Sequence, residues 1–320
     1  MRAPDTYTLV ADIGGTNTRV ALAEGPRLLT ETVRRYPNRN YPGLETVLRA
    51  FIDEEDGVDC KSACVALAGP VADGRGTLTN LDWEIDETSL KNATSAETAR
   101  LLNDLQAQGH ALGALPETSV RELVSGTEAP AHATKLVIGV GTGFNIAPVF
   151  ETPSGRHVPA SEAGHANLPI RTADELALMR FFETAHGFPA VEDMLSGRGL
   201  ERVYLWLSEQ NGARKEMPAA DIMSGFESGT DPIAQKAAEM FVRMLGTVSG
   251  NLSLIQLPFG GIYFAGGVAR AFAPHFDALG FLSAFRDKGR FAGFMQNFAV
   301  HVIEDDYAAL TGCARYIDQA

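Results

Sequence analysis

The first feature of the sequence is a pair of apolar runs separated by a short polar turn. Residues 9–13 and 20–22 are apolar except for Asp12, and a Gly-Gly pair begins the turn between them. Two runs around a glycine pair are typical of a β-hairpin, and consecutive backbone N–H groups without Cβ atoms form an anion site. The pattern predicts either an ordinary polar turn or a phosphate-binding hairpin, made by Gly14, Gly15, Thr16 and Asn17.

A second copy of this pattern occupies residues 136–149. Two distant copies of one supersecondary unit predict two similar lobes that face each other, with a ligand between their turns. Only the first copy has a carboxylate, and a Mg²⁺ ion that bridges phosphate oxygens takes oxygen ligands, so we expect any metal near Asp12. Aligned without a gap, the copies match Gly14 to Gly141, Gly15 to Thr142, Thr16 to Gly143 and Asp12 to Gly139.

The remaining apolar pattern alternates short strands with amphipathic helices. Apolar side chains recur at helical spacing in several segments, and runs of apolar residues bounded by turn residues mark the strands. This alternation predicts an α/β protein. The expected helices are residues 44–52, 104–112, 173–186, 200–207 and 233–254, and the expected strands are residues 63–68, 78–83, 98–102 and 259–268.

Composition and charge argue against several classes of protein. The chain has 320 residues, 45% hydrophobic and 21% charged, which is ordinary for a globular protein and long enough for two lobes. Its net charge of -13 argues against a general affinity for nucleic acid or an anionic membrane. Three cysteines without a C-x-x-C pair fit neither a disulfide framework nor a zinc site. With no apolar leader or membrane-length run, we expect a cytoplasmic protein with no nucleic-acid or membrane partner.

A strand is expected to end, and a helix to begin, at Asn103 and Asp104. Ligands in open α/β sheets bind at the carboxyl ends of strands, so both side chains are candidates for a site. Asn and Asp also cap helices at such places, and capping is compatible with catalysis. The helix dipole should keep Asp104 ionised while it accepts a proton from a substrate hydroxyl. An ordinary pKa of about 3.9 would make it a weak base, which matters little where proton removal is not the main contribution.

Further polar groups stand among small residues or glycines. Glu162 and His165 have Ser, Ala and Gly around them, so a ligand with several hydroxyls can approach the backbone there. Glu192 by itself is indistinguishable from a surface residue. Asn80 and the nearby Trp83 combine a polar group with an aromatic face, which is typical of a sugar site and equally of a turn with a packed Trp. The glycine pair Gly266 and Gly267, at the end of a strand, would let the flat ring of an adenosine approach the backbone.

These segments together resemble the bacterial ATP-dependent glucokinases, members of the actin, hexokinase and sugar kinase fold group. The resemblance runs nearly end to end. The first phosphate turn is typical of the whole fold group, whereas the later segments in combination are typical of the family. The matching segments are Asp12 to Asn17, Leu78-Thr79-Asn80 with Trp83, Asn103-Asp104, Gly141-Thr142-Gly143, Glu162 with Gly164-His165, Glu192 with Leu195-Ser196-Gly197, Phe259 to Gly267, and Asp287-Lys288-Gly289-Arg290-Phe291.

The resemblance implies a two-lobed actin/hexokinase-like (ribonuclease H-like) α/β fold, with duplicated lobes around a central cleft. It implies transfer of the γ-phosphoryl group of ATP to the 6-hydroxyl of D-glucose, with Asp104 as the base and Asp12 facing Mg²⁺ through water. ATP and Mg²⁺ are the implied cofactors, and glucose and ATP are the implied partners. Whether the chain forms a homodimer is left open. The other implied contacts are Asn80, Asn103, Glu162, His165 and Glu192 with the sugar, Gly14, Gly15, Thr16, Asn17, Gly141, Thr142 and Gly143 with phosphates, and Gly266 and Gly267 with adenosine.

Three segments depart from the family pattern. Asn145 stands where the second turn usually continues with glycine, which can alter how closely that turn approaches the nucleotide. Ser161 and Ala163 replace glycines before the histidine, so the sugar pocket can be tighter or differently shaped. Residues 306–310 read Asp-Tyr-Ala-Ala-Leu in place of a more usual Asn-Pro-Gly-Leu-Leu. None of the three removes a proposed catalytic group.

The expected division is a small lobe of residues 1–104 plus 306–320 and a large lobe of residues 105–305, which close on the sugar and exclude water. Two alternatives stand beside a glucokinase. A kinase for another hexose or an amino sugar would use the pocket reshaped by Ser161 and Ala163. A non-catalytic sugar sensor would keep the fold without turnover, with Asn145 as its only indication.

Overall fold

The computed structural model describes residues 7–78 and 81–319, which form two compact units. Unit 1 takes in the chain up to Glu117, the segment Pro153–Ala160 and the chain from Asp305 onward. Unit 2 is made of Thr118–Thr152 and Ser161–Glu304. No helix within the described ranges is both long enough and apolar enough to cross a bilayer.

Unit 1 is built on a mixed sheet with the strand order β3-β2-β1-β4-β8. β1 and β2 form the predicted hairpin, and β3 continues the antiparallel pairing. β4 and β8 then add in parallel, as the α/β pattern predicts. The strands are β1 (Tyr7–Ile13), β2 (Asn17–Glu24), β3 (Arg27–Pro37), β4 (Cys60–Leu67) and β8 (Thr98–Asn103), and a separate small sheet contains β5 (Val71–Ala72), β6 (Arg75–Leu78) and β7 (Leu81–Asp86).

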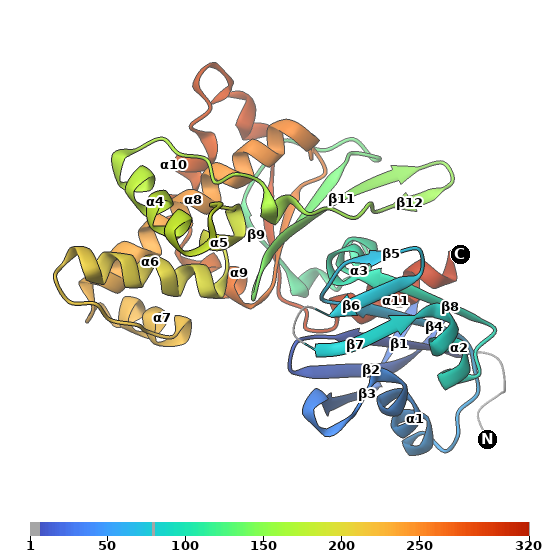
Figure 1. Ribbon diagram of the computed structural model, residues 1–320. Helices are drawn as coiled ribbons and strands as arrows, with labels where there is room; N and C mark the ends of the chain where they lie inside the picture. The colour runs from blue at the N-terminus through green and yellow to red at the C-terminus, as the bar shows by residue number, and fades with distance from the viewer. Residues whose placement is uncertain (1–6, 79–80, 320) are drawn as a thin grey trace. The chain divides into compact units, whose positions relative to one another are not determined.

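Helices cover both faces of this sheet, because successive residues of a strand point to opposite faces. α1 (Leu44–Glu54) and α2 (Glu87–Thr94) pack on the face that carries Leu9 and Ala11. α3 (Asp104–Ala111) and α11 (Ala308–Asp318) pack on the face that carries Val10 (Figure 1). Asp12 follows Val10 by two residues, so its side chain lies on the α3 and α11 face of the sheet.

Unit 2 repeats this arrangement with β10 in the place of β1. β10 pairs antiparallel with β11 and parallel with β13, and β14 follows in parallel. β9 pairs antiparallel with β14. The shared order of a hairpin followed by parallel strands confirms the predicted duplication. The strands are β9 (Val120–Val124), β10 (Lys135–Val140), β11 (Phe144–Thr152), β13 (Ile262–Ala265) and β14 (Val300–Ile303), while β12 (Gly155–His157) lies in the segment assigned to unit 1.

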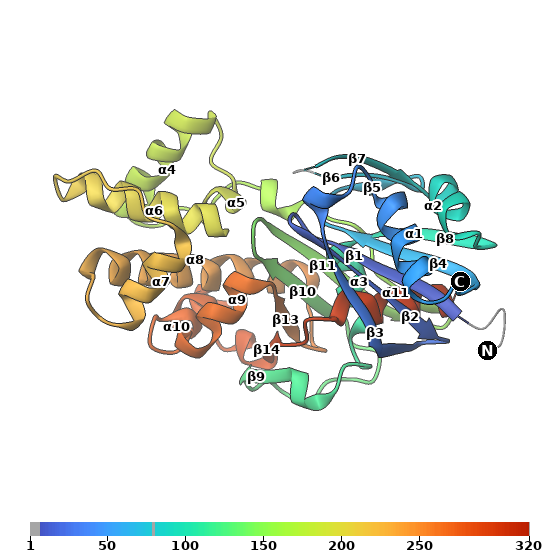
Figure 2. The ribbon, with the colours of Figure 1, turned by 90° about the horizontal axis from the view of Figure 1, so that it is seen from below.

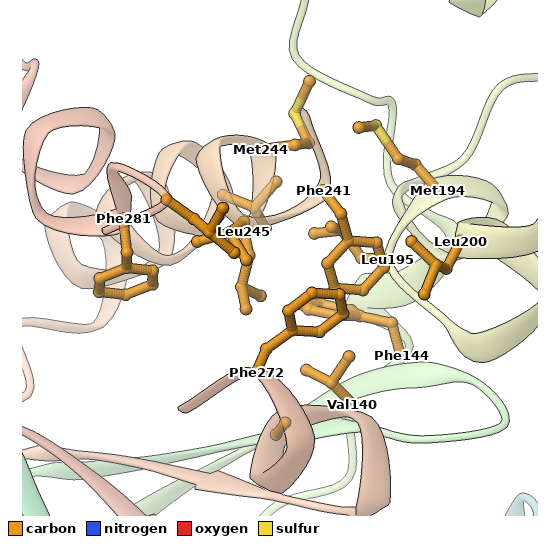
Figure 3. Close-up of a cluster of buried hydrophobic side chains, with 14 of the residues drawn as sticks. Val140, Phe144, Met194, Leu195, Leu200, Phe241, Met244, Leu245, Phe272 and Phe281 are labelled. Carbon is orange, nitrogen blue, oxygen red and sulfur yellow. The ribbon is translucent and has the colours of Figure 1, made fainter. Parts of the chain in front are cut away.

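The long helix α8 organises the core of unit 2 (Figures 2 and 3). Its Phe241 stacks on Phe272, with ring centroids 4.9 Å apart. Val140 and Phe144, which flank the second hairpin turn, belong to the same buried cluster, so this core anchors the turn from behind. Met244 is 1% exposed and fills space there, as predicted. The helices are α4 (Ala173–His186), α5 (Val191–Met194), α6 (Gly197–Gln210), α7 (Ala219–Glu227), α8 (Pro232–Gln256), α9 (Gly267–Phe272) and α10 (Phe281–Arg286).

The two hairpin turns differ in length. Ile13 pairs with Thr18 across the first turn, whereas Val140 pairs with Phe144 across the second, which is one residue shorter. The gapless alignment of the two copies therefore holds into the turn and slips afterwards. As a result Asp12 has Arg19 as its cross-strand partner, and the partner of Gly139 is Asn145.

The helix α3 belongs to unit 1, although the predicted boundary after residue 104 placed it in the other lobe. Its Ala107 is buried against α11 in the core of unit 1. Its C-terminal carbonyls at Gly109 and His110 accept hydrogen bonds from Arg156 Nη1, at 3.1 and 2.9 Å. Both sets of contacts tie α3 to elements of unit 1, which no local sequence pattern could indicate.

The contact between α3 and α11 generates a stability prediction. A Cβ added at Gly312 would overlap the carbonyl oxygen of Ala107, and a backbone atom inside a helix cannot move aside. We expect Gly312→Ala to lower the free energy of unfolding by about 1–3 kcal/mol, as overpacked cores do. Urea unfolding followed by circular dichroism measures this change.

Gly293 is the matched control, because it has helical φ and ψ values (-66° and -35°) and nothing within 4 Å of an added Cβ. We expect Gly293→Ala to leave stability nearly unchanged. If Gly312→Ala were as stable as Gly293→Ala, the close approach of α11 to α3 would be refuted.

Candidate active site

The first hairpin turn is braced from the neighbouring strand region. The N–H of Gly14 donates to the carbonyl of Asn17 at 3.0 Å, while Gly15 and Thr16 are exposed. Asn38, only 2% exposed, donates its side-chain amide to the carbonyl of Gly14 at 2.8 Å and its backbone N–H to that of Thr16 at 2.9 Å. The turn is therefore held in shape while its outer backbone faces solvent, which is the arrangement an anion site needs.

Asp12 stands just before this turn and is paired with a cation. Its Oδ2 lies 3.2 Å from Arg19 Nη1, across the β1–β2 pair. Burial raises the pKa of Asp12, and the Arg19 guanidinium offsets part of that increase. The Asp12 carboxylate therefore lies at the edge of the predicted phosphate-binding turn, and its negative charge is paired with the Arg19 guanidinium.

Asn103 and Asp104 lie at the junction of β8 and α3, as predicted. Asn103 is the N-cap of α3: its Oδ1 accepts from the N–H of Leu105 at 3.0 Å, and its own N–H donates to Gln106 Oε1 at 3.1 Å. One hydrogen of its side-chain amide goes to the carbonyl of Gly69 at 3.0 Å. The same side-chain amide also hydrogen-bonds the Asp104 carboxylate and favours its charged form, so this capping residue ties Gly69 to Asp104.

The carboxyl group of Asp104 has a strongly displaced pKa. Burial and the negative charge of Asp12 raise the pKa of Asp104 to about 7. Hydrogen bonds at the start of α3 favour the carboxylate and offset part of this increase. The expectation of a weak base with a pKa near 3.9 is therefore wrong for the free protein. The helix dipole does favour the charge, but desolvation outweighs it. A pKa near the working pH suits a general base.

The second hairpin turn is held by two hydrogen bonds from nearby helices. The N–H of Gly197, at the start of α6, donates to the carbonyl of Gly141 at 2.8 Å. Glu192 Oε2, on α5, accepts from the N–H of Phe144 at 2.9 Å. A Cβ on Gly143 would come within 2.4 Å of Glu192 Oε2, so a side chain at this position would displace the carboxylate from the turn. The structure thus brings Glu192 to the turn at Gly141, Thr142 and Gly143, which its sequence context did not indicate.

Glu162 and His165 lie on a short exposed loop beside the second hairpin. Their side chains are 62% and 70% exposed, and Glu162 Oε2 is 4.0 Å from His165 Nε2. Gly164, between them, is buried so close to β11 that a Cβ on it would overlap the carbonyl of Phe144. Both polar groups therefore point to solvent from a backbone that rests on β11, with capacity for ligand hydroxyls.

The remaining predicted site residues are Gly266, Gly267 and Asn80. Gly266 has φ of 98° and a Cβ there would come within 2.5 Å of the carbonyl of Val140, so glycine is required for packing in its own right. Gly267 begins α9, is exposed and has nothing within 4 Å of an added Cβ, which leaves its backbone accessible. Asn80 lies outside the described residues.

Within residues 7–78 and 81–319, no cluster of three or more His, Cys, Asp or Glu side chains could hold a metal ion. Mg²⁺, however, keeps several waters and commonly takes one or two carboxylates plus substrate phosphates. Asp12 beside the Gly14–Asn17 turn offers that donor set, so the residues fit a water-mediated Mg²⁺ bound together with phosphate.

Sequence reasoning missed two bracing residues. Asn38 follows β3 and looks like an ordinary turn residue, and its partners Gly14 and Thr16 lie far away in the chain. Gly69 directly follows the expected strand at residues 63–68 and looks like an ordinary strand-ending glycine, but its carbonyl accepts from Asn103. The signal for Gly69 was the missing side chain itself, since a Cβ there would overlap the carbonyl of Thr77.

Comparisons with known proteins identify a family over nearly the whole chain. A family model described as Glucokinase matches residues 9–320. A glucokinase from Saccharophagus degradans is 33% identical over 97% of this chain and 98% of its own. The crystal structure of a glucokinase from an Antarctic psychrotroph is similar over 98% of this chain and 99% of that one, with a TM-score of 0.86 and 27% identity. A glucokinase of the ROK family from Streptomyces griseus, solved with glucose and AMPPNP, shares the fold over 97% of this chain and 98% of that one, with a TM-score of 0.63 and 17% identity.

The displaced pKa of Asp104 predicts a pH-dependent stability. The folded chain, with a pKa of about 7, binds this proton more tightly than an unfolded chain with a pKa of about 3.9. Ionisation of Asp104 therefore reduces stability progressively as the pH rises from about 4 to about 7. Asp104→Asn removes this penalty, so its Tm should exceed that of the wild type at pH 8, and the gain should shrink toward pH 5.

Differential scanning calorimetry across this pH range measures the effect, with Asp53→Asn as the control because Asp53 is an exposed carboxylate on α1. The control should show no such trend. A Tm difference for Asp104→Asn that is the same at pH 5 and pH 8 would contradict the displaced pKa.

Proposed function

The chain belongs to the glucokinase family, and we propose that its residues divide the transfer of the γ-phosphoryl group from ATP to the 6-hydroxyl of glucose as follows. The observation that supports this most directly is Asp104, a carboxyl group at a helix N-terminus whose pKa is raised to about 7. Among the predicted site residues, it has the burial, charge environment and anchoring that a general base requires.

Asp104 would accept the proton of the sugar 6-hydroxyl as the sugar oxygen forms its bond to the γ-phosphorus. The bond from phosphorus to the bridging oxygen of ATP breaks, its electron pair leaves with ADP, and the proton remains on Asp104. Oδ1 accepts the N–H of Leu105 at 2.9 Å, which limits rotation of the carboxylate. Since the transition state is loose, most of the rate comes from orientation, and proton removal adds about 10² to 10⁴.

The remaining sugar hydroxyls would be held by groups from each unit. In unit 1, Asn103 would offer its side-chain amide, which lies beside the Asp104 carboxylate. In unit 2, Glu162 and His165 offer acceptors or donors on their exposed loop, and Glu192 offers the oxygen that does not accept from Phe144. Asn80 keeps the role that the resemblance assigns to it.

The two glycine turns would hold the phosphates through backbone N–H groups, Gly14 to Asn17 in one unit and Gly141 to Gly143 in the other. Gly267, with its open backbone, would lie beside adenosine together with Gly266. A Mg²⁺ ion held through water by Asp12 would offset phosphate charge, which lowers the cost of charge that develops on the leaving group. ATP and Mg²⁺ are thus the proposed cofactors.

A cytoplasmic setting is proposed on the state of the cysteines. Cys60, Cys64 and Cys313 are all free and buried, as in a reducing compartment.

A second candidate is a kinase for another hexose or an amino sugar. Ser161 supports it, because its side-chain hydroxyl accepts from the N–H of Ala163 at 3.2 Å and so takes part in shaping the Glu162 loop. The non-catalytic sensor is less well supported, since Asp104 retains the environment of a base.

A sugar panel tests the proposed function. ADP release should be fastest with glucose among glucose, mannose, fructose, glucosamine and N-acetylmannosamine, compared by kcat/KM. Asp104→Ala should lose at least about 10²-fold in kcat while its glucose Kd, measured by calorimetry, stays close to that of the wild type. A clear preference for another sugar would replace glucose, and undiminished turnover in Asp104→Ala would remove Asp104 from the chemistry.

The metal proposal has its own test. Asp12→Ala should raise the Mg²⁺ concentration needed for half-maximal turnover by about tenfold or more while leaving the glucose Kd unchanged, because the carboxylate serves the phosphate side. It should also lower the pKa of Asp104, since the Asp12 charge contributes to raising it. Glu24→Ala, which removes an exposed carboxylate paired with Arg27 in the same hairpin, is the control. An unchanged Mg²⁺ requirement in Asp12→Ala would refute the role.

A further inference from the structure

Asn145 uses its whole side-chain amide on one loop and its own strand. Its Nδ2 donates to the carbonyl of Ser161 and to Glu162 Oε2, the latter at 3.4 Å. Its Oδ1 accepts from the N–H of Ala163 at 3.1 Å and from the N–H of Ile146 at 2.8 Å. An Asn amide has two hydrogens and two acceptor positions, so every one of them is occupied. Three of the four partners belong to residues 161–163.

The register of the β10–β11 hairpin explains why the side chain can reach that loop. Asn145 pairs with Gly139, whereas the equivalent pair in unit 1 is Arg19 with Asp12. In unit 1 the two side chains engage each other across the strands. Gly139 has no side chain to engage, so the polar side chain opposite it is free to turn to a third segment.

We propose that Asn145 is a positioning residue for the sugar-binding loop, holding residues 161–163 so that Glu162 meets the sugar hydroxyls. The proposal rests on the proposed function, in which Glu162 binds glucose. Asn145 holds one oxygen of Glu162 and the backbone on both sides of it, which leaves the other oxygen, Oε1, oriented for a ligand. The earlier interpretation, that Asn145 affects the approach of the nucleotide, is thereby replaced by an effect on the sugar.

This assignment separates two kinetic constants. If Asn145 orders the Glu162 loop, its loss weakens sugar binding and leaves the nucleotide turn at Gly141 in place, because that turn is held by Gly197 and Glu192 instead. If Asn145 only contributes to the stability of β11, its loss lowers Tm and moves neither constant.

The test compares Asn145→Ala, Asn145→Asp and the control Asn211→Ala. Asn145→Asp keeps the acceptor oxygen and the size of the side chain but loses both donated bonds and adds a negative charge next to Glu162. Asn211 donates its amide to the carbonyl of Leu207 at 2.8 Å at the end of α6, so Asn211→Ala removes an amide of similar use elsewhere in unit 2.

For both Asn145 variants we expect a glucose KM raised about tenfold or more and an ATP KM within about twofold of the wild type, the size that loss of hydrogen bonds to a charged group produces. Amides of residues 161–165 should exchange with solvent faster in both variants, measured by hydrogen exchange with mass spectrometry. Asn211→Ala should alter neither constant nor the exchange of that loop.

Three results would overturn the proposal. They are an unchanged glucose KM, an ATP KM that rises as much as the glucose KM, and loop exchange equal to that of the wild type. Wild-type protein assayed alongside separates the two levels of failure. Turnover of glucose by the wild type with unaltered Asn145 variants refutes only the role of Asn145, whereas no glucose-dependent ADP release by the wild type refutes the proposed function and this inference with it.

Discussion

Unit 1 is built around the carboxyl group of Asp104, which lies where a negative charge is costly. Burial and the charge of Asp12 work against ionisation of Asp104, and only hydrogen bonds at the start of α3 favour it. The surroundings keep this balance fixed. Asn103 caps the helix, and Gln106, which completes the cap, is itself tied to the carbonyl of Val158 at 2.8 Å. The cap and the packing of α3 thereby hold the carboxyl group of Asp104 in one environment.

The two hairpins show how one fold unit acquires two uses. Both have a glycine turn flanked by strands buried in a core, and both are followed by parallel strands. The cross-strand position behind the turn differs, because it holds the ion pair of Asp12 and Arg19 in one copy and Gly139 with Asn145 in the other. One copy therefore presents a carboxylate at the turn, while the other directs an amide to a separate loop.

Features set by short-range chemistry could be predicted from the sequence. α4 was expected at residues 173–186 and has those bounds, since Thr172 caps its start and Gly187, with φ of 74°, ends it. The junction at Asn103 and Asp104 was also found correctly. Features set by distant partners could not be predicted. The pKa of Asp104 depends on Asp12, the turn at Gly14 depends on Asn38, and the contact of Glu192 with Phe144 depends on the packing of α5. The one-residue difference in length between the two hairpin turns was also missed, because a gapless alignment assumes turns of equal length.

The helix α11 completes the core of unit 1 from the far end of the chain. Leu310, Cys313 and Ala314 are fully buried with Val10 and the other residues on that face of the sheet. During synthesis, the strands of unit 1 leave the ribosome long before this helix does, and all of unit 2 is made in between. The sheet of unit 1 therefore receives this covering helix only after unit 2 has been made, and until then the surface that α11 covers is exposed apolar surface of the kind that chaperones bind. Loss of α11 would in this way damage a sheet whose strands all precede unit 2 in the chain.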